Sequence, residues 1–170
     1  MAVTFLALGS NLGKREVYLR NAILGLRDHG IDIVRIASVY ETEPKDVDGQ
    51  PWFLNTVVEA RTTLTPRQLL SVCLSIERQN QRLRSLPKSA RTLDIDILFY
   101  ESEILHEEGL SIPHPRFAGR NFVLIPLAEI APHFVDPLSH AAIETLKERS
   151  TDPAQVRRFL SGEQILDTLQ

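Results

Sequence analysis

The chain has 170 residues and a formal net charge of −3, with 43% hydrophobic and 24% charged residues. This composition is typical of one soluble globular domain of ordinary core size. No segment of the sequence approaches the length of continuous apolar residues that a membrane span needs, and the N-terminus lacks the basic region of a secretory signal. A single cysteine, Cys73, excludes an internal disulfide and a cysteine-based zinc cluster, so we expect one cytoplasmic domain over residues 1–170.

Hydrophobic periodicity predicts alternating strands and helices along the first hundred residues. Gly30 fits the residue that ends the first helix, and Thr65 with Pro66 and Gln68 fits the start of the second, which buries Cys73. We predict strands over residues 3–8, 31–40, 52–61 and 91–100, helices over residues 15–29 and 65–81, and a polar loop over residues 41–51.

This order of elements is the ferredoxin-like βαββαβ pattern, an α+β sandwich whose mainly antiparallel sheet carries both helices on one face. Beyond residue 137, Ser139 and Asp152-Pro153 resemble helix starts, and Val156, Phe159 and Leu160 recur at helical spacing. We therefore expect a C-terminal helical extension over residues 138–170 that packs on the domain, and a monomer in preference to a homodimer.

The strand over residues 91–100 carries two carboxylates on one face. Side chains alternate across a strand, so Asp94 and Asp96 share one face while Ile95 and Ile97 share the other. Like charges held this close are easiest to keep when a cation lies between them, and Mg²⁺ prefers oxygen ligands. The alternative interpretation, a solvated sheet face, is equally compatible with the pair alone.

The segment just before this strand is locally basic, although the whole chain is mildly acidic. Residues 78–91 carry five cations and no carboxylate: Arg78, Arg82, Arg84, Lys88 and Arg91. A solvated loop would explain the run by itself. Together with paired carboxylates, the run favours chemistry on a polyphosphate, where cations and a metal neutralise the transferred group.

Several motifs lie in register across residues 1–137, at residues 8–12, 40–44, 50–55, 91–98, 112–116 and 120–132. With these motifs in this order, the chain resembles the 6-hydroxymethyl-7,8-dihydropterin pyrophosphokinase family of folate biosynthesis. The resemblance implies transfer of pyrophosphate from ATP to the pterin alcohol, giving AMP, by direct in-line displacement.

The resemblance also implies roles for individual residues. Asp94 and Asp96 are expected to hold two Mg²⁺ ions and to act in catalysis with Arg82 and Arg91. Phe53 and Phe122 are expected to stack on the pterin ring, whose edge Asn55 reads. The remaining expected contacts are Glu77, Arg82, Arg84, Arg91, Ile97, His114 and Arg116 for ATP, and Thr42, Pro44, Asp94 and Arg120 for the pterin.

Two loops depart from the family pattern, because residues 88–90 replace its Trp-Gly-Pro and Lys45-Asp46 replace a hydrophobic residue and Gly. We expect the loops over residues 41–51 and 83–90 to be mobile without ligands. An RNA-binding module of the same fold, or a regulatory domain without catalysis, are the alternative functions. The RNA interpretation is disfavoured, because no aromatic RNA-binding motif is present and Asp94 and Asp96 would repel a phosphate backbone. We expect no nucleic-acid or membrane partner.

Overall fold

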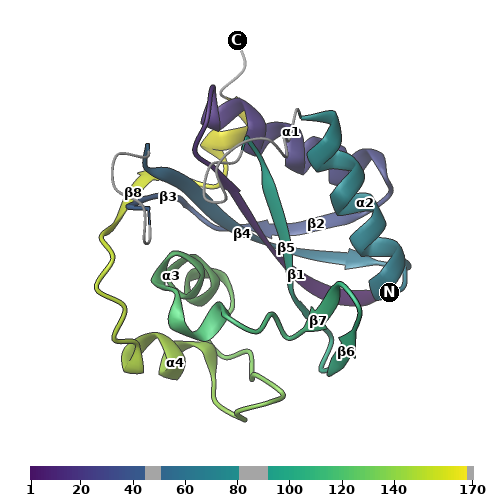
Figure 1. The fold of residues 1–170 in the computed structure, drawn as a ribbon, viewed down its shortest axis with the longest axis vertical. Coiled ribbons are helices and arrows are strands. Elements are labelled where there is room, and N and C mark those ends of the chain that lie inside the picture. The colour runs from purple at the N-terminus through teal and green to yellow at the C-terminus, as the bar shows by residue number, and fades with distance from the viewer. Residues whose placement is uncertain (45–50, 81–91, 168–170) are drawn as a thin grey trace.

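The computed structural model describes residues 1–44, 51–80 and 92–167 (Figure 1). It is an α+β domain with a mainly antiparallel sheet, as predicted. The elements are β1 (Ala2–Ser10), α1 (Arg15–Asp28), β2 (Asp32–Ile36), β3 (Val39–Thr42), β4 (Phe53–Thr62), α2 (Pro66–Gln79), β5 (Asp94–Tyr100), β6 (Leu105–Glu107), β7 (Leu110–Ile112), a 3₁₀ turn (Phe117–Gly119), α3 (Asn121–Ile130), α4 (Ile143–Arg149), β8 (Val156–Leu160) and a second 3₁₀ turn (Gln164–Asp167).

Within the described residues, the main sheet has six strands in the order β5-β1-β4-β3-β8, with β2 also pairing with β4. The predicted strand over residues 31–40 is wrong in one respect, because it is divided into β2 and β3. At the break, the Ser38 amide donates to the carboxylate of Glu129 (2.8 Å) and the Ala37 carbonyl accepts from the Thr56 hydroxyl (2.9 Å). Side chains thus replace part of the ladder here.

Helices α1 and α2 cover one face of the sheet, and their local sequence explains where they begin and end. The predicted capping box is confirmed, since Thr65 accepts from the Gln68 amide and the Gln68 side chain accepts from the Thr65 amide. Gly30 follows α1 with φ +76°, which only glycine adopts freely. The core on this face contains Leu6, Leu8, Leu19, Ile23, Leu26, Leu69, Cys73, Ile76, Ile95 and Ile97.

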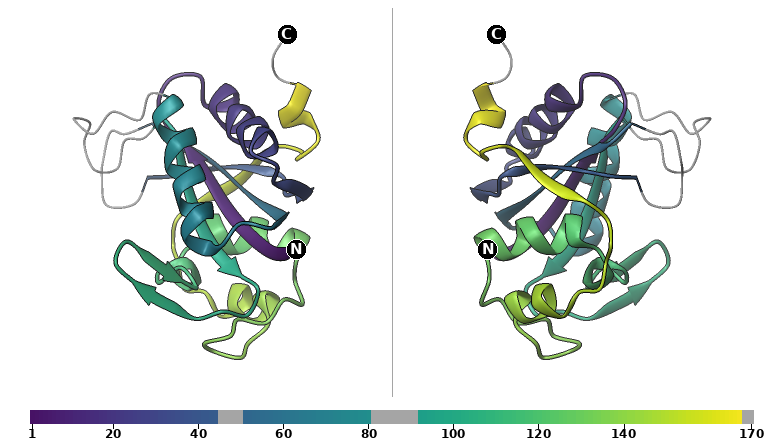
Figure 2. Two further views of the ribbon diagram at one scale, coloured as in Figure 1. Left: turned by 90° about the vertical axis from the view of Figure 1, so that its right-hand side faces the viewer. Right: turned by 90° about the vertical axis from the view of Figure 1, so that its left-hand side faces the viewer.

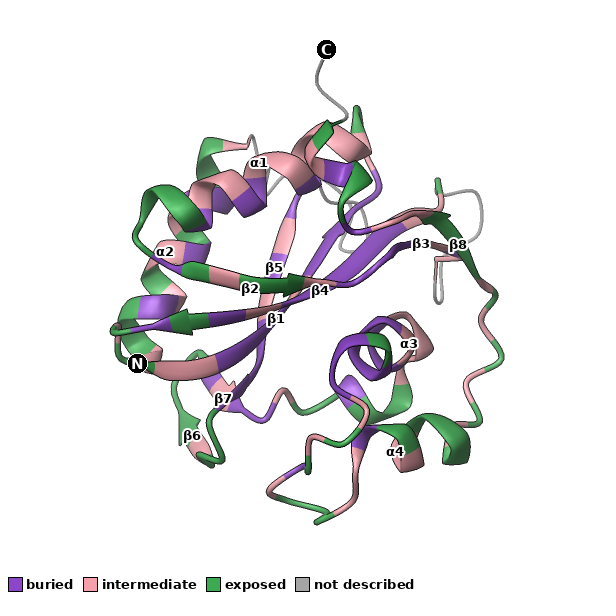
Figure 3. Cartoon of the chain, turned by 180° about the vertical axis from the view of Figure 1, so that it is seen from behind, coloured by how far each residue is buried: buried purple, intermediate pink, exposed green. Residues whose placement is uncertain are grey.

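The prediction that both helices of the βαββαβ unit share one face is confirmed for α1 and α2, whereas α3 and α4 form a second helical layer on the opposite face (Figure 2). The reason is that the second face is apolar too: Phe5, Val57 and Phe99 form a core with Leu124 and Leu127 of α3. Figure 3 shows α3 as a largely buried helix beside the strands. The face that carries Asp94 and Asp96 is therefore only partly open.

The C-terminal part is less helical than predicted. Helix α4 begins at Ile143 instead of Ser139, and the segment after Asp152-Pro153 forms strand β8, which pairs with β3. The spacing of Val156 and Leu160 fits a helix, but pairing with the edge of β3 satisfies backbone groups that would otherwise remain open. None of the helices in the described part of the chain has the length and hydrophobicity needed to cross a membrane.

Candidate functional site

The two aspartates of β5 point to the face of the sheet that α3 partly covers. Asp94 pairs with Gly9 and Asp96 pairs with Ala7 of β1, whereas Ile95 is buried on the opposite face. Both aspartates are half-buried, and alternation along a strand separates their α-carbons by about 7 Å. The predicted arrangement of one carboxylate face and one apolar face is confirmed, in a strand that begins at Asp94.

A buried carboxylate on α2 holds the outer edge of this strand. Glu77 is only 2% exposed, and its Oε2 accepts a hydrogen bond of 2.8 Å from the amide of Ile95. Among the described residues β5 is the edge strand of the sheet, so the hydrogen bond from Glu77 takes the place of a strand partner on that side. Glu77 therefore fixes the backbone between the two aspartates.

Ile97 is buried toward α1 and α2, so a contact of Ile97 with a ligand would use its backbone.

Gly9 lies in one cross-strand row between Asn55 of β4 and Asp94 of β5. Residues directly opposite each other in antiparallel strands share a face, so Asn55 and Asp94 flank a position that has no side chain. The Asn55 amide lies over that position, because a Cβ on Gly9 would be 2.6 Å from Asn55 Oδ1. Asn55 Nδ2 donates to the hydroxyl of Thr42 (2.8 Å), which fixes the amide plane.

Phe53 precedes Asn55 by two residues, so it projects on the same face of β4. It is half-buried and pairs with Thr42 of β3. Thr42 is part of β3, and the predicted polar loop therefore begins after this strand instead of at Glu41. Pro44 is half-buried beyond the end of β3.

A histidine and two arginines follow β7 and approach the aspartates. The His114 amide donates to the Leu98 carbonyl of β5 (2.9 Å), and His114 Nδ1 lies 3.2 Å from the Arg116 amide. Burial, together with the charges of Arg120 and Arg116, lowers the pKa of His114 to about 4, although Asp94 opposes this shift. At neutral pH the imidazole is thus neutral; Nδ1 accepts from the Arg116 amide, which leaves the proton on Nε2.

Arg120 and Phe122 stand at the start of α3. Burial and the neighbouring Arg116 lower the pKa of Arg120, while Asp96 and Asp94 counteract the shift, which places the guanidinium in the field of both carboxylates. The Arg120 guanidinium also lies over the Phe122 ring, 5.4 Å from its centre. The site thus combines two carboxylates, two arginines and a neutral histidine around a half-buried aromatic ring.

The donor set of this face fits Mg²⁺. Asp94 and Asp96 offer carboxylate oxygens, and Mg²⁺ is commonly held by one or two carboxylates that leave its other positions to water and phosphate oxygens. Across residues 1–44, 51–80 and 92–167, no group of three or more His, Cys, Asp or Glu side chains is placed to hold a metal.

Three predicted site residues, Arg82, Arg84 and Arg91, lie outside the described residues, as do residues 45–50 and 83–90 of the two expected loops. The contributions of Gly9 and Asp152 to the site were not predicted, although both residues lie in segments that the sequence analysis singled out. Gly9 acts through its missing side chain. Asp152 lies far along the sequence, yet its carboxylate accepts from the amide of Asn121 at the start of α3 (2.8 Å).

Comparison with known proteins gives a consistent result. A family model described as 7,8-dihydro-6-hydroxymethylpterin-pyrophosphokinase matches residues 5–132. A Bacillus subtilis protein named 2-amino-4-hydroxy-6-hydroxymethyldihydropteridine pyrophosphokinase is 43% identical over 129 residues, which are 75% of this chain and 77% of that protein.

Two longer proteins are also similar. The folic acid synthesis protein of Pneumocystis carinii is 37% identical over 148 residues, which cover 87% of this chain but 20% of that protein. A crystal structure of the Plasmodium falciparum HPPK-DHPS protein aligns with a TM-score of 0.70 at 16% identity, covering 87% of this chain and 44% of that one. The structural likeness supports the fold.

Proposed function

Because the chain belongs to the 7,8-dihydro-6-hydroxymethylpterin-pyrophosphokinase family, it is an ATP-dependent diphosphokinase, and we propose that its substrates are ATP and 6-hydroxymethyl-7,8-dihydropterin. The products are AMP and the pterin diphosphate, an intermediate of folate biosynthesis. The observation that carries the proposal is the row Asn55–Gly9–Asp94. The backbones of Asn55 and Asp94 stand about 10 Å apart, as two strand spacings require, and both residues face one side of the sheet with only glycine between them.

This row suits a flat polar ring whose reactive arm points to a polyphosphate. Asn55 can both donate to and accept from the edge of a pterin, and Thr42 keeps its amide in one orientation. Phe53 lies beside Asn55 on the same face, and Phe122 approaches with α3, so each offers a ring for stacking. The hydroxymethyl arm would extend over Gly9 toward Asp94 and Asp96.

Asp94 and Asp96 would hold the two Mg²⁺ ions of the proposal, which supply positive charge to the polyphosphate when bound. Arg116 and Arg120 contribute positive charge from the protein on the same side, and neutral His114 can donate one hydrogen bond through Nε2. These groups bind and orient ATP so that its β-phosphorus faces the pterin hydroxyl. Arg82, Arg84 and Arg91 are proposed to contact the phosphates as well.

The proposed step is direct displacement. The pterin oxygen forms a bond to the β-phosphorus and loses its proton, while the bond between that phosphorus and the oxygen bridging to the α-phosphate breaks, releasing AMP. A cysteine nucleophile is excluded at the one cysteine, because burial, with smaller effects of Glu77 and Asp96, raises the pKa of Cys73 to about 12. Positioning and electrostatic stabilisation therefore account for the catalysis.

The test is the identity of the products. Purified protein, ATP, Mg²⁺ and the pterin alcohol should give AMP and a pterin diphosphate in equal amounts, separated by ion-exchange chromatography. Release of ADP with a pterin monophosphate would mean attack at the γ-phosphorus and an ordinary kinase. Absence of any reaction, with ATP and pterin still bound, would favour the alternative of a ligand-binding regulatory domain.

A further inference from the structure

The C-terminal segment over residues 152–157, here called the strap, connects α4 to β8 and touches two separate parts of the proposed pterin site (Figure 1). The strap lies beyond residues 5–132, the part that matches the family model. Its contacts run from the start of α3 at one end to β3 at the other.

At its first end the strap holds the start of α3. Asp152 Oδ2 accepts from the Asn121 amide (2.8 Å), and the Asp152 carbonyl accepts from Asn121 Nδ2 (3.2 Å). Arg120, the residue before the helix, makes no side-chain cap of its own. Asp152, although 31 residues later in the sequence, therefore supplies the capping acceptor that a helix start needs. The capped amide belongs to Asn121, which lies between the ligand-facing residues Arg120 and Phe122.

At its other end the strap holds β3 just beyond Thr42. The Glu43 amide donates to the Gln155 carbonyl (3.1 Å), and the Gln155 amide donates to Glu43 Oε1 (3.0 Å). Val156 then pairs with Thr42, whose hydroxyl fixes the amide of Asn55. The strap thus pairs directly with Thr42, the residue that orients the amide proposed to read the pterin.

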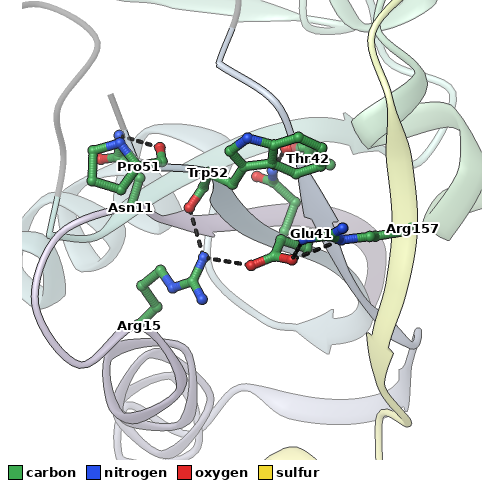
Figure 4. Close-up of polar contacts among 8 residues, drawn as sticks. Asn11, Arg15, Glu41, Thr42, Pro51, Trp52 and Arg157 are labelled. Atoms are coloured by element: carbon green, nitrogen blue, oxygen red, sulfur yellow. Dashed lines mark hydrogen bonds and ion pairs between the residues drawn. The ribbon is translucent and has the colours of Figure 1, made fainter. Parts of the chain in front are cut away.

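Arg157 closes this end through the cluster drawn in Figure 4. Its guanidinium donates twice to Glu41 Oε1, at 2.8 and 2.6 Å, and lies over the Trp52 ring at 4.6 Å. Arg15 of α1 donates to the other oxygen of Glu41 (3.1 Å) and to the Trp52 carbonyl (2.7 Å). Residue 41 and residue 52, on β3 and at the start of β4, are therefore tied together behind the face that carries Phe53 and Asn55.

We propose that the strap sets the position of the start of α3 relative to β3 and β4, the two parts of the fold that carry the proposed pterin contacts. Arg157 and Asp152 are then positioning residues for pterin binding. This inference rests on the proposed function. Exposed ion pairs contribute little to stability, so the expected effect of Arg157 is on the geometry of the site rather than on folding. Holding binding groups in place before the ligand arrives reduces the cost of ordering them on binding.

The test compares Arg157→Ala with a matched control, Arg35→Ala. Arg35 also donates through two nitrogens to a cross-strand glutamate, Glu59, and the glutamate side chain is 14% exposed in both pairs. Arg35 lies on β2, away from the site. Both variants should unfold at nearly the same temperature as wild type, whereas only Arg157→Ala should weaken pterin binding.

For Arg157→Ala we expect the Kd of the pterin, measured by ligand fluorescence, and its KM to rise about tenfold, because the binding groups then have to be ordered when the ligand binds. The kcat should stay near that of wild type, since ground-state and transition-state binding are lost together. Asp152→Ala should raise the same Kd. Asp152→Asn should restore it in part, because an amide oxygen can still accept from Asn121.

The double variant Arg157→Ala with Asp152→Ala should raise the pterin Kd by less than the product of the single effects, because the two residues hold one segment. An Arg157→Ala variant that binds pterin like Arg35→Ala would overturn the inference. A wild-type protein that forms no AMP would overturn the proposed function instead, and the two failures are distinct because the Kd is measured without turnover.

Discussion

Substitution of Gly9 by alanine tests the row that carries the functional proposal. The added methyl group would lie 2.6 Å from Asn55 Oδ1, closer than side-chain carbons approach oxygen, while the next atoms, Asn55 Cγ and the Leu54 carbonyl oxygen, are 3.7 and 3.8 Å away. The conflict is therefore with one amide group. Asn55 has to rotate away, and its hydrogen bond to Thr42 is lost.

The size of the effect follows from these contacts. Loss of the Asn55–Thr42 hydrogen bond should lower the free energy of unfolding by about 1 kcal/mol. A displaced amide also leaves pterin edge groups without partners, at about 1–3 kcal/mol, which corresponds to a Kd roughly 5- to 150-fold higher. Binding should thus be affected more than stability.

The assay is a pterin titration and a urea denaturation of four proteins: wild type, Gly9→Ala, Asn55→Ala and the double variant. Without the Asn55 side chain, the methyl group at position 9 meets nothing closer than 3.8 Å. Gly9→Ala should then change neither the Kd nor the stability beyond the few tenths of a kcal/mol expected for independent sites. An equally large effect of Gly9→Ala in both backgrounds would refute the reasoning, because the damage would then lie in the β1 backbone.

Two further predictions concern His114 and Glu77. The pKa of His114 is about 4 in the folded protein and about 6.5 in the unfolded chain, so as pH falls the unfolded chain protonates His114 before the folded protein does. Wild type should therefore lose stability as pH falls from 6.5 to 4, and His114→Asn should lose less. Urea denaturation at several pH values measures this, and parallel curves for the two proteins would contradict it. Glu77→Ala leaves the Ile95 amide buried without its carboxylate partner and should cost about 1–3 kcal/mol of stability, more than Glu77→Gln, which keeps an acceptor; equal unfolding midpoints for both variants would argue against this role.

Elements with a strong local signal were predictable from the sequence. The alternation around Asp94 and Asp96 gave the two faces of β5, and Thr65 with Gln68 gave the start of α2, because alternation and capping depend on neighbouring residues. The helical spacing of residues 156–160 was misleading, because the structure of this segment depends on a distant partner instead of on neighbouring residues. The partner that makes this segment a strand is the edge of β3, more than a hundred residues earlier.

The site was predictable where motifs mark it and not where it depends on tertiary contacts. Asn55 and Asp94 could be named from family resemblance, but their placement on either side of Gly9 follows from strand register. Helix α3 was not predicted, since its apolar run contains Pro126 and has no clear polar face. The cap that Asp152 provides for α3 likewise depends on the path of the chain after α4.

The central claim is that Asp96, together with Asp94, serves catalysis rather than folding, and Asp96→Ala tests it most directly. Asp96 is half-buried on the ligand face, outside both apolar cores, so the melting temperature should change little. The pterin Kd should also stay close to wild type, because Asn55, Phe53 and Phe122 are unchanged. The rate of AMP formation should fall by roughly 10²-fold or more, as expected when a group that stabilises the transferred phosphates is removed. Near-normal turnover in this variant would contradict the account and leave Asp94 and Asp96 as a solvated sheet face.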